Sequence, residues 1–563
     1  MIVRRRRLSL SSAAKTPAPQ RRGVILLAVL VVVAILTLIG YRFFNLMNAE
    51  HEAAFATNRV SQSRYLADSG LHYAAFVLSY PQTVGLSDAP DESSNLIFPS
   101  LVYDNPTVFH LRPVTASGNS QGFFSIVAPR TPDDPMLTSA QPFRFGVEDE
   151  GGKVNINALL KMDPSGKKAK DILTKLPNVT SDIADSIIAW AQASGSSTSA
   201  SGDALYYSSL GYAPKYGPYE SSEELLLVKG ITPQLLLGND TNRNGVFDPE
   251  EDDGSGAVDR GLSRLITVYS RERNFDSTGN QRVWINDSDL NNLETNLQNA
   301  GVDQDLITFI LAYRMYGAAT TTMTIRISGG SSVGGTVELS QTQSGGSTSQ
   351  NKLDRQQLDT SSVQANRLQK ISSLYDLIDA QVSVPNKSQG GSGQGQGQGQ
   401  QSTKYASPLK KNDAQVLREM LPPLLDKAST SQQLELPPRI NINTAPIEVL
   451  QALPNLADAD VQNILDHRPG PNTDPSQGPL YRTPAWLITE AGFDTSVVKQ
   501  LDSYITTCSQ VYRVQVIGYY DHGGPSVRLE AVIDTNNGRP KFLYWRDLTE
   551  LGRGFDLRTL MQQ

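Results

Sequence analysis

The sequence predicts an α+β protein in which a long N-terminal helix packs on an antiparallel sheet that carries a large helical insertion. Three features lead to this prediction. An apolar run follows a basic leader, strand-like segments lie at both ends of the remaining chain, and a repeated helical pattern separates them. The 563 residues are enough for several domains.

The N-terminal segment combines a basic leader, which ends at Gly23, with an uncharged apolar run from 24 to 40. A transmembrane helix is expected at this place, with its positive flank in the cytoplasm. No Ala-x-Ala site closes the run, so it does not match an ordinary cleaved secretory signal. From 41 to 80, apolar residues keep a mostly helical spacing without proline, which predicts that the helix continues as an amphipathic stem.

Strand-like segments form two clusters that lie far apart in the sequence. Alternating apolar and aromatic residues predict these strands, and turns rich in Gly and Asn separate the C-terminal ones. We expect both clusters to join in one sheet that packs on the stem, with the residues between them forming an insertion. The predicted strands are 101–103, 108–111, 122–128 and 143–147 in the first cluster, and 512–520, 527–534 and 541–545 in the second.

The insertion contains an internal repeat. Residues 154–190 and 439–465 both join an Asn-Ile-Asn segment to a Leu-Pro-Asn turn and a second apolar helix, and residues 283–311 form a weaker copy. Each copy has the pattern of a polar N-cap, a short helix, a tight turn and another helix. Such self-similarity predicts a duplicated helical unit. Two low-complexity stretches, 329–350 and 388–402, are expected to be linkers.

The hairpins are similar to helix-hairpin-helix modules, which in other proteins hold DNA phosphates through glycine-rich turns. Here the turns at 177–179 and 454–456 lack the glycines that bring backbone amides to a phosphate. Acidic residues line the helices that follow, where a DNA-binding protein needs Lys or Arg. Because the net charge is −7 as well, we expect no nucleic-acid partner and a protein-interaction role instead. The acidic residues are Asp182, Asp185, Asp458 and Asp460.

A twelve-residue loop from 240 to 251 matches the oxygen pattern of a calcium site. Oxygen-bearing side chains occupy positions 1, 3, 5 and 9, a glycine at position 6 allows the sharp turn, and a glutamate ends the loop. Position 7 contributes its backbone carbonyl. The flanks do not resemble two EF-hand helices, so an isolated structural calcium loop is predicted, with a merely solvated acidic loop as the alternative. The predicted ligands are Asp240, Asn242, Asn244, Val246, Asp248 and Glu251.

The sequence shows no recognisable nucleophile and base in a catalytic motif, and we therefore expect no enzymatic activity. Its single cysteine, Cys508, excludes an intrachain disulfide, and the five histidines are too scattered to suggest a metal cluster. Glu148 and Glu150 precede the first hairpin and would form the acid–base pair of a hydrolase. A turn, or an oxygen-rich patch near the calcium loop, is the simpler interpretation of this pair.

A leader that ends in Gly before an apolar helix resembles a type IV prepilin signal. In that family a prepilin peptidase cuts after the glycine and methylates the new amine, which implies cleavage after Gly23 and methylation of Val24. Most members carry Glu at the fifth mature position, where this chain has Ala28. The K-type minor pseudopilins, placed at the tip of the type II secretion fibre, are known for lacking this Glu.

Features in the same order over most of the chain resemble the general secretion pathway protein K family. They are the leader, the segments 148–157, 176–190 and 219–231, and the second Asn-Ile-Asn repeat ahead of the C-terminal strands. The resemblance implies a type IV pilin-like fold with a large all-α insertion of helix-hairpin-helix or SAM-like repeats. The chain departs from the family in its low-complexity stretches, its third hairpin copy and its single cysteine, since members often have a disulfide.

The patterns and the resemblance together imply a domain organisation. In chain order it comprises a cleaved leader 1–23, a transmembrane helix 24–45, the stem continuation 46–80, the first part of the pilin-like domain 81–148, a helical insertion with the calcium loop 149–328, a linker 329–350, a helical segment 351–387, a linker 388–403, the second hairpin repeat 404–507 and the C-terminal strands 508–563.

The resemblance implies a non-enzymatic minor pseudopilin at the tip of the type II secretion pseudopilus. It would be anchored in the inner membrane by one span, with its body in the periplasm and calcium as a structural cofactor. The implied partners are the I-type and J-type minor pseudopilins, the major pseudopilin and the prepilin peptidase. Three alternatives stay open: a minor pilin of a type IV pilus or DNA-uptake machine, a membrane-anchored hydrolase that uses Glu148 or Glu150, and a calcium-dependent adhesin with an uncleaved leader.

Overall fold

The chain divides into two compact units, Met1–Gln62 and Ser63–Gln563, in the computed structural model. The structure describes most of the second unit and the helical part of the first. The described residues are 22–80, 99–117, 120–130, 143–192, 200–252, 254, 258–319, 352–360, 364–385, 402–470, 473–536, 539–552 and 554–561.

Helix α1, Arg22–Ser79, begins the described chain. Its part from Ile25 onward is long and apolar enough to cross a membrane, with a mean hydropathy of 2.6 over its most apolar window. In the first unit its large apolar side chains are exposed, as Leu26 at 72 % and Phe44 at 61 % show. The prediction that the apolar run continues as a helix to about residue 80 is confirmed.

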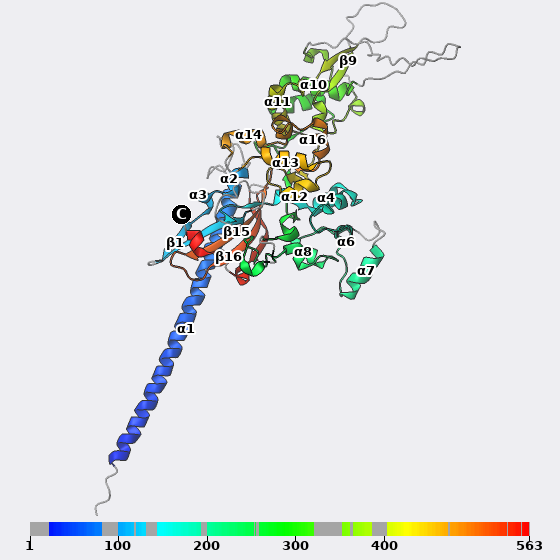
Figure 1. Ribbon diagram of the computed structural model, residues 1–563. Coiled ribbons are helices and arrows are strands. Elements are labelled where there is room, and N and C mark those ends of the chain that lie inside the picture. Colours follow the sequence, from blue (N-terminus) through cyan, green and yellow to red (C-terminus); the bar gives the residue numbers. More distant parts are fainter. Residues whose placement is uncertain are drawn as a thin grey trace, which may run out of the picture. The chain divides into compact units, whose positions relative to one another are not determined.

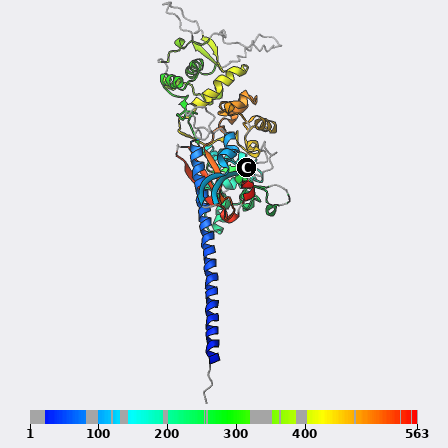
Figure 2. The ribbon, with the colours of Figure 1, turned by 90° about the vertical axis from the view of Figure 1, so that its left-hand side faces the viewer.

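The main sheet is antiparallel and seven-stranded, and it joins strands from both ends of the chain. The strands run in the order β1-β2-β15-β16-β17, while β3 pairs with β2 and β4 pairs with β15. Figures 1 and 2 both show the blue and cyan N-terminal strands beside the orange and red C-terminal ones. The prediction of one sheet built from two distant clusters is therefore confirmed. The bounds are β1 Arg112–Ser117, β2 Ser120–Pro129, β3 Phe143–Arg144, β4 Glu148–Asp149, β15 Val511–Tyr520, β16 Val527–Asp534 and β17 Lys541–Asp547.

The last four turns of α1 pack on this sheet. Leu71, Ala74 and Leu78 are almost completely buried and share one core with Val516 and other sheet residues. Alternation explains the sheet side of this core, because side chains i and i+2 of a strand point to the same face. Helix spacing explains the other side, where buried residues recur at three and four positions. The C-terminal elements η10 Thr549–Leu551 and α17 Leu557–Met561 close the domain, and Leu557 belongs to the same core.

Two predicted strands are wrong. Residues 101–103 lie in helix α2, Pro99–Tyr103, and of residues 108–111 the first two end helix α3, Pro106–Phe109. Each of these short helices begins with proline, whose fixed φ suits a first helical position and whose missing N–H costs nothing there. Val108 and Phe109 are still buried, so the apolar residues that suggested strands reach the core from a single helical turn.

The segment between the two strand clusters has its own hydrophobic core, separate from that of the sheet. Most of its regular elements are helices, as predicted. Its helices are α4 Ile156–Met162, α5 Lys167–Leu173, α6 Ser181–Ala191, α7 Ala200–Ser209, α8 Pro233–Leu237, α9 Leu290–Asn299, α10 Gln304–Tyr316, α11 Ala414–Lys427, α12 Ile447–Ala452, α13 Asp458–His467, α14 Gly478–Tyr481, α15 Trp486–Thr489 and α16 Thr495–Leu501. Short 3₁₀ helices connect them: η2 Glu150–Gly152, η3 Ser222–Leu227, η4 Pro249–Glu251, η5 Gly261–Arg264, η6 Arg355–Gln357, η7 Ala365–Arg367, η8 Leu374–Leu377 and η9 Pro475–Gln477.

The expectation of an all-α insertion needs correction, because short strand pairs hold the segment together. Four of these pairs are two residues long and one is a hairpin of two five-residue strands. Their hydrogen bonds satisfy backbone groups that helices leave unpaired. The pairs are β5 Val154–Asn155 with β6 Ile266–Thr267, β7 Glu272–Arg273 with β12 Glu435–Leu436, β8 Val283–Trp284 with β11 Ala428–Ser429, β13 Ile440–Asn441 with β14 Ile505–Thr506, and the hairpin β9 Gln381–Pro385 with β10 Ser402–Ala406. The predicted linker 329–350 lies outside the described residues, as does most of 388–403, whose last two residues belong to β10.

The first and second repeats share two local features. Asn178 and Asn455, in the middle of the two Leu-Pro-Asn turns, adopt left-handed φ values of 61° and 59°. Asn tolerates this conformation better than most residues, which explains its place in both turns. Each repeat also begins at a parallel bridge, β5 with β6 and β13 with β14. The third, weaker copy contains the helix pair α9 and α10, each with an Asp side chain as its N-cap.

Candidate functional site

The predicted processing site lies at the start of α1. Gly23 and Val24 are the second and third residues of the helix, and Ala28, at the fifth mature position, lies one turn further on an exposed stretch. Nothing is described of the side chains at 22–24, so cleavage after Gly23 and methylation of Val24 stay predictions.

The predicted calcium loop follows α8 and contains η4 at its C-terminal end. Two residues in it have left-handed backbone conformations, Arg243 with φ 57° and Gly245 with φ 66°, which close the turn sharply. Asp240 receives hydrogen bonds from the backbone N–H groups of Asn244 and Gly245, both at 3.0 Å. The carboxylate at position 1 thus already organises the following backbone, as it does in calcium loops.

The other predicted ligands converge on the same loop. Asp248 Oδ2 accepts hydrogen bonds from Nδ2 of Asn242 at 2.6 Å and from Nδ2 of Asn244 at 2.8 Å. Glu251 reaches back to the start of the loop, where its Oε1 accepts from the N–H of Asn242 at 3.0 Å. The N–H of Val246 donates to Asn244 Oδ1 at 2.7 Å. The structure therefore brings all six predicted ligand residues together in one turn.

The electrostatics of the loop suit a cation. Burial raises the pKa of Asp240 to about 6, against the opposing charge of Arg260 and with a further contribution from Glu251. The second carboxylate oxygen of Glu251 is buried and has no hydrogen-bond partner. Such an orphaned oxygen beside a desolvated carboxylate is an unfavourable arrangement that a bound cation would relieve.

The donor set nevertheless limits what the loop can bind. Among the described residues, no three His, Cys, Asp or Glu side chains gather closely enough to hold a metal by themselves. A cation here depends on the two asparagine side chains and the Val246 carbonyl as well as on carboxylates. An all-oxygen set with few charges fits calcium better than a transition metal.

The loop is attached to the sheet and to the C-terminal segment. Gln515 on β15 donates to the Arg243 carbonyl at 2.8 Å, and the buried Arg528 on β16 donates to the Asn242 carbonyl. Asn244 donates to the Gly554 carbonyl at 2.5 Å. Burial lowers the pKa of Arg528 to about 10, while the loop carboxylates oppose this shift. The loop is therefore a contact between the insertion and the sheet domain.

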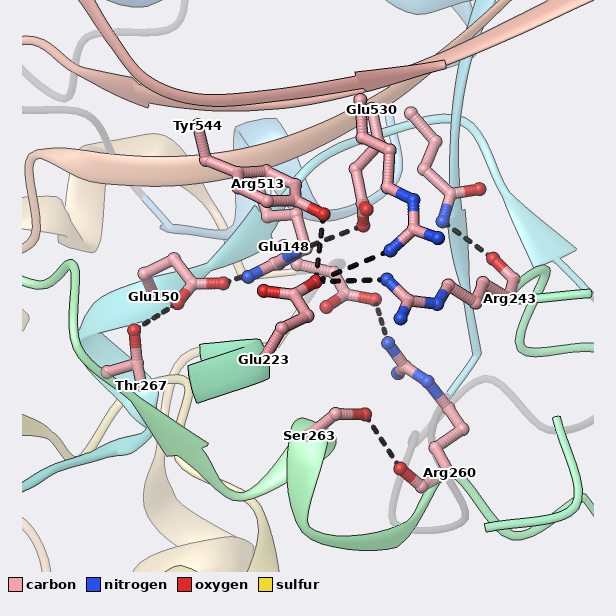
Figure 3. Close-up of polar contacts among 12 residues, drawn as sticks. Glu148, Glu150, Glu223, Arg243, Arg260, Ser263, Thr267, Arg513, Glu530 and Tyr544 are labelled. Carbon is pink, nitrogen blue, oxygen red and sulfur yellow. Dashed lines mark hydrogen bonds and ion pairs between the residues drawn. The ribbon is translucent and has the colours of Figure 1, made fainter. Parts of the chain in front are cut away.

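A network of buried charges makes a second contact between them (Figure 3). Arg513 on β15 donates from Nε to Glu150 Oε1 at 2.7 Å and from Nη1 to Glu530 Oε1 at 3.1 Å. Glu150 also accepts from Lys153 Nζ at 2.8 Å and from Thr267 Oγ1. The side chain of Glu150 is completely buried, so these donors replace the water that it loses on folding.

Two more carboxylates extend the network towards the loop. Glu148 accepts from Arg260 Nη2 at 2.7 Å. Glu223 accepts from Arg243 Nη1 at 3.1 Å and from the Tyr544 hydroxyl at 2.8 Å. The predicted oxygen-rich patch of Glu148 and Glu150 lies near the loop through Arg260, which binds Glu148 and whose charge also acts on Asp240. Arg243 of the loop itself binds Glu223. The two arrangements form one polar layer, from the acidic segment at 148–150 to the loop (Figure 3).

Glu148 and Glu150, the two glutamates of the acidic segment, are held ionised. Burial alone would raise the pKa of Glu148 and of Glu150. Arg260 opposes it most strongly at Glu148 and Arg513 at Glu150, and each pKa falls to about 2. A glycosidase acid needs a raised pKa, so the hydrolase alternative gains no support from this pair. Their arrangement suits a structural ion-pair network.

Sequence reasoning named only Glu148 and Glu150 of this layer and missed its other charged residues. Arg513, Glu530 and Arg528 lie inside strands that are otherwise almost wholly apolar. A charged residue inside such a strand was the available signal, because charges are seldom buried without a partner. The partner of Arg513 lies 363 residues away in the sequence, and no local pattern identifies it.

Residues 440–503 match the family model described as type II secretion system (T2SS), protein K. The matched range begins at β13 and contains α12 to α16, that is, the second repeat and the helices after it. The resemblance inferred from the sequence is thereby confirmed in this part of the chain, and it supports a role in type II secretion. No curated protein matches the chain.

Proposed function

We propose that this protein is a minor pseudopilin at the tip of the type II secretion pseudopilus, with a part in protein secretion across the outer membrane. The observation that carries the proposal is the match of residues 440–503 to protein K of that system. The mixed architecture supports it, because a long apolar helix followed by an antiparallel sheet is what a pilin-like subunit requires. The repeats between the strands would be a duplicated helical unit of the helix-hairpin-helix type.

The anchor of the proposed subunit is α1. Its apolar part would cross the inner membrane once, and the basic leader would hold the N-terminus in the cytoplasm. The body, from the end of α1 to the C-terminus, would then lie in the periplasm. Prepilin peptidase would cut after Gly23 and methylate Val24.

The tip position is supported by the residue at position 28. In a fibre, a Glu at the fifth mature position neutralises the terminal amine of a neighbouring subunit inside the apolar helix bundle, where an unpaired charge is costly. A subunit at the tip has no neighbour above it to neutralise, so Ala28 is sufficient there. The proposed partners are the I-type and J-type minor pseudopilins, together with the major pseudopilin.

Calcium is the proposed cofactor, bound by the loop from 240 to 251. The side-chain oxygens of Asp240, Asn242, Asn244, Asp248 and Glu251 and the carbonyl of Val246 would hold it. The ion would supply positive charge to the desolvated carboxylates and the orphaned Glu251 oxygen. Its role would be structural, since the loop attaches the insertion to β15 and β16. We propose no enzymatic activity and no nucleic-acid partner.

Mass spectrometry of the N-terminus of the membrane-extracted protein tests the proposal. A mature chain that starts at methylated Val24 is the expected result. The variant Gly23→Leu should stay uncut, whereas Gly40→Leu, the same change further along α1 at a site with free space around it, should be processed normally. A wild-type chain that keeps Met1 or Ile2 as its first residue would overturn the pseudopilin assignment.

A further inference from the structure

A cavity of about 270 Å³ lies where the sheet domain meets η5 and the second repeat of the insertion. Arg144 and Tyr512 contribute from the sheet, Arg264 from η5, and Thr444 and Leu465 from the second repeat. Small-molecule pockets begin at about 300 Å³, so this volume suits a compact group rather than a large ligand. Nothing in the proposed function uses this cavity.

Basic residues outnumber acidic ones in the lining itself, although Lys153 also pairs with Glu150 and Arg264 with Glu448, which lie outside the lining. Its cations are Arg144, Lys153, Arg260, Arg264 and Arg468, and its acids are Glu148, Asp149 and Asp466. Glu148 is neutralised within the lining, because it binds Arg260 at 2.7 Å and lies 3.5 Å from Lys153 Nζ. Asp149 takes its hydrogen bonds from neutral donors, among them the Thr444 hydroxyl at 2.6 Å, and burial raises its pKa.

Arg144 is the most informative residue of the lining. It is 97 % buried, yet it makes no ion pair with any described residue. Its Nη1 donates to the carbonyls of Val147, at 3.1 Å, and Tyr103, and its guanidinium lies 3.8 Å from the centre of the Tyr103 ring. The Nε atom is buried without a hydrogen-bond partner. A buried guanidinium is normally paired with an anion. Among the described residues, Glu148 is close enough to feel the charge of Arg144, but it forms its ion pairs with Arg260 and Lys153.

Arg264, another arginine of the lining, also has a buried nitrogen without a hydrogen-bond partner. Arg264 binds Glu448 through Nη2 at 2.5 Å, but its Nε is also buried without a partner. The uncharged lining includes Asn443 and Thr444 but is largely apolar, with Val102, Val147, Pro446 and Leu465 among its residues. An anion bound here would therefore carry an apolar group beside its charge. Arginine favours planar carboxylates, which it can bind through two parallel hydrogen bonds.

We propose that this cavity binds a polypeptide carboxylate that is attached to an apolar residue. The carboxylate has two possible sources, the C-terminus of a peptide chain or an Asp or Glu side chain next to an apolar residue. In both cases the carboxylate pairs with Arg144 while the apolar group contacts Val147 and Leu465. The proposal does not depend on the pseudopilin assignment, because it rests on the lining alone.

Calorimetric titration of the full-length protein in detergent tests the proposal with three probes. N-acetyl-leucine presents a C-terminal carboxylate, N-acetyl-leucinamide lacks it, and N-acetyl-aspartic α-amide carries only a side-chain carboxylate. We expect at least one of the acids to bind and the leucinamide to bind at least tenfold more weakly. The better acid identifies the source. Equal binding of acid and amide, or no binding of either acid at millimolar concentrations, would overturn the proposal.

Substitutions of lining residues test whether the acid binds in this cavity. Arg144→Gln should weaken binding of the acid about tenfold, as expected for the loss of a charge-assisted hydrogen bond. Because Arg144 is buried and its replacement can disturb folding, a second variant acts in the opposite direction. Asp466 is an exposed acid of the lining, and Asp466→Asn should tighten binding roughly threefold by removing a like charge. Asp458→Asn, on the same helix α13 but outside the lining, is the control and should change nothing. An equal effect of the two α13 variants would contradict the site.

Discussion

Arg513 and Glu150 form a buried ion pair with 2.7 Å between Nε and Oε1, and this pair joins the central strand of the sheet to the first turn of the insertion. The sheet and the insertion have separate hydrophobic cores, so apolar packing alone does not unite them. A small apolar cluster of Tyr269, Val511 and Val532 joins them. The charged contact lies beside it and continues through Arg260 and Arg243 to the predicted calcium loop. The orientation of the insertion on the sheet thus depends on groups that respond to substitution, pH and cations.

Replacing Glu150 tests how much the network contributes to stability. Glu150→Gln keeps the shape of the side chain and removes its charge, which leaves Arg513 and Lys153 each with one carboxylate, Glu530 and Glu148. Breaking a buried pair costs about 3–5 kcal/mol, and we expect the lower end because both cations keep a partner. Denaturant unfolding followed by tryptophan fluorescence measures the loss.

A matched substitution in an exposed pair provides the control. Lys170 and Asp185 lie 2.7 Å apart with more than a third of each side chain exposed. Asp185→Asn should therefore lower the free energy of unfolding by no more than about 1 kcal/mol. Equal losses of unfolding free energy in Asp185→Asn and Glu150→Gln would show that the buried network contributes no more to stability than an exposed ion pair.

The same network predicts a dependence on acid. The pKa of Glu150 is about 2 in the folded protein, below its ordinary value of 4.5. A lowered pKa contributes stability that is fully present above 4.5 and disappears as the pH falls from there towards 2. We expect the melting temperature of the wild type to fall over this window and that of Glu150→Gln to fall less. Comparing the two proteins isolates this carboxylate from the others, and parallel curves would refute its role.

Much of the fold followed from local patterns, whereas the contacts that unite it did not. The apolar run predicted α1, and apolar and aromatic residues bounded by Gly- and Asn-rich turns predicted β15 and β16 almost to their ends. The prolines that start α2 and α3 overrode a strand-like composition because they fix the backbone of a first helical turn. The spacing of oxygen-bearing residues within the segment 240–251 likewise predicted which six residues come together in the loop. Arg513 and Arg528 were missed because their partners come from distant segments, and pairing across such distances leaves no period in the sequence.

Helix α1 approaches β15 closely at a glycine, and this contact is testable. A Cβ atom at Gly518 would lie 2.5 Å from the Ala67 backbone nitrogen, which cannot move aside as a flexible side chain would. Gly518→Ala should therefore push the helix from the sheet and lower the free energy of unfolding by about 1–3 kcal/mol. Gly217→Ala is the control, since its nearest neighbour would be 3.8 Å away. A similar loss in both variants would mean that the close approach is unimportant.

Calcium removal provides the test of the loop from 240 to 251. If the loop binds calcium only in the folded protein, the ion stabilises the fold by about 2.7 kcal/mol at one hundred times its dissociation constant. We expect chelation to lower the melting temperature of the wild type and added calcium to restore it, while magnesium, which demands a stricter geometry, restores less. Asp248→Asn removes one charged ligand and should abolish most of the calcium-dependent shift. Glu250→Gln makes the same change of charge at an exposed neighbour outside the ligand pattern and should preserve the shift. A melting temperature that does not respond to calcium, or an equal loss of response in both variants, would reduce the loop to a solvated acidic turn. The attachment of the insertion would then rest on Arg528 and Gln515, on the buried charges and on the apolar contact of Tyr269 with β15 and β16.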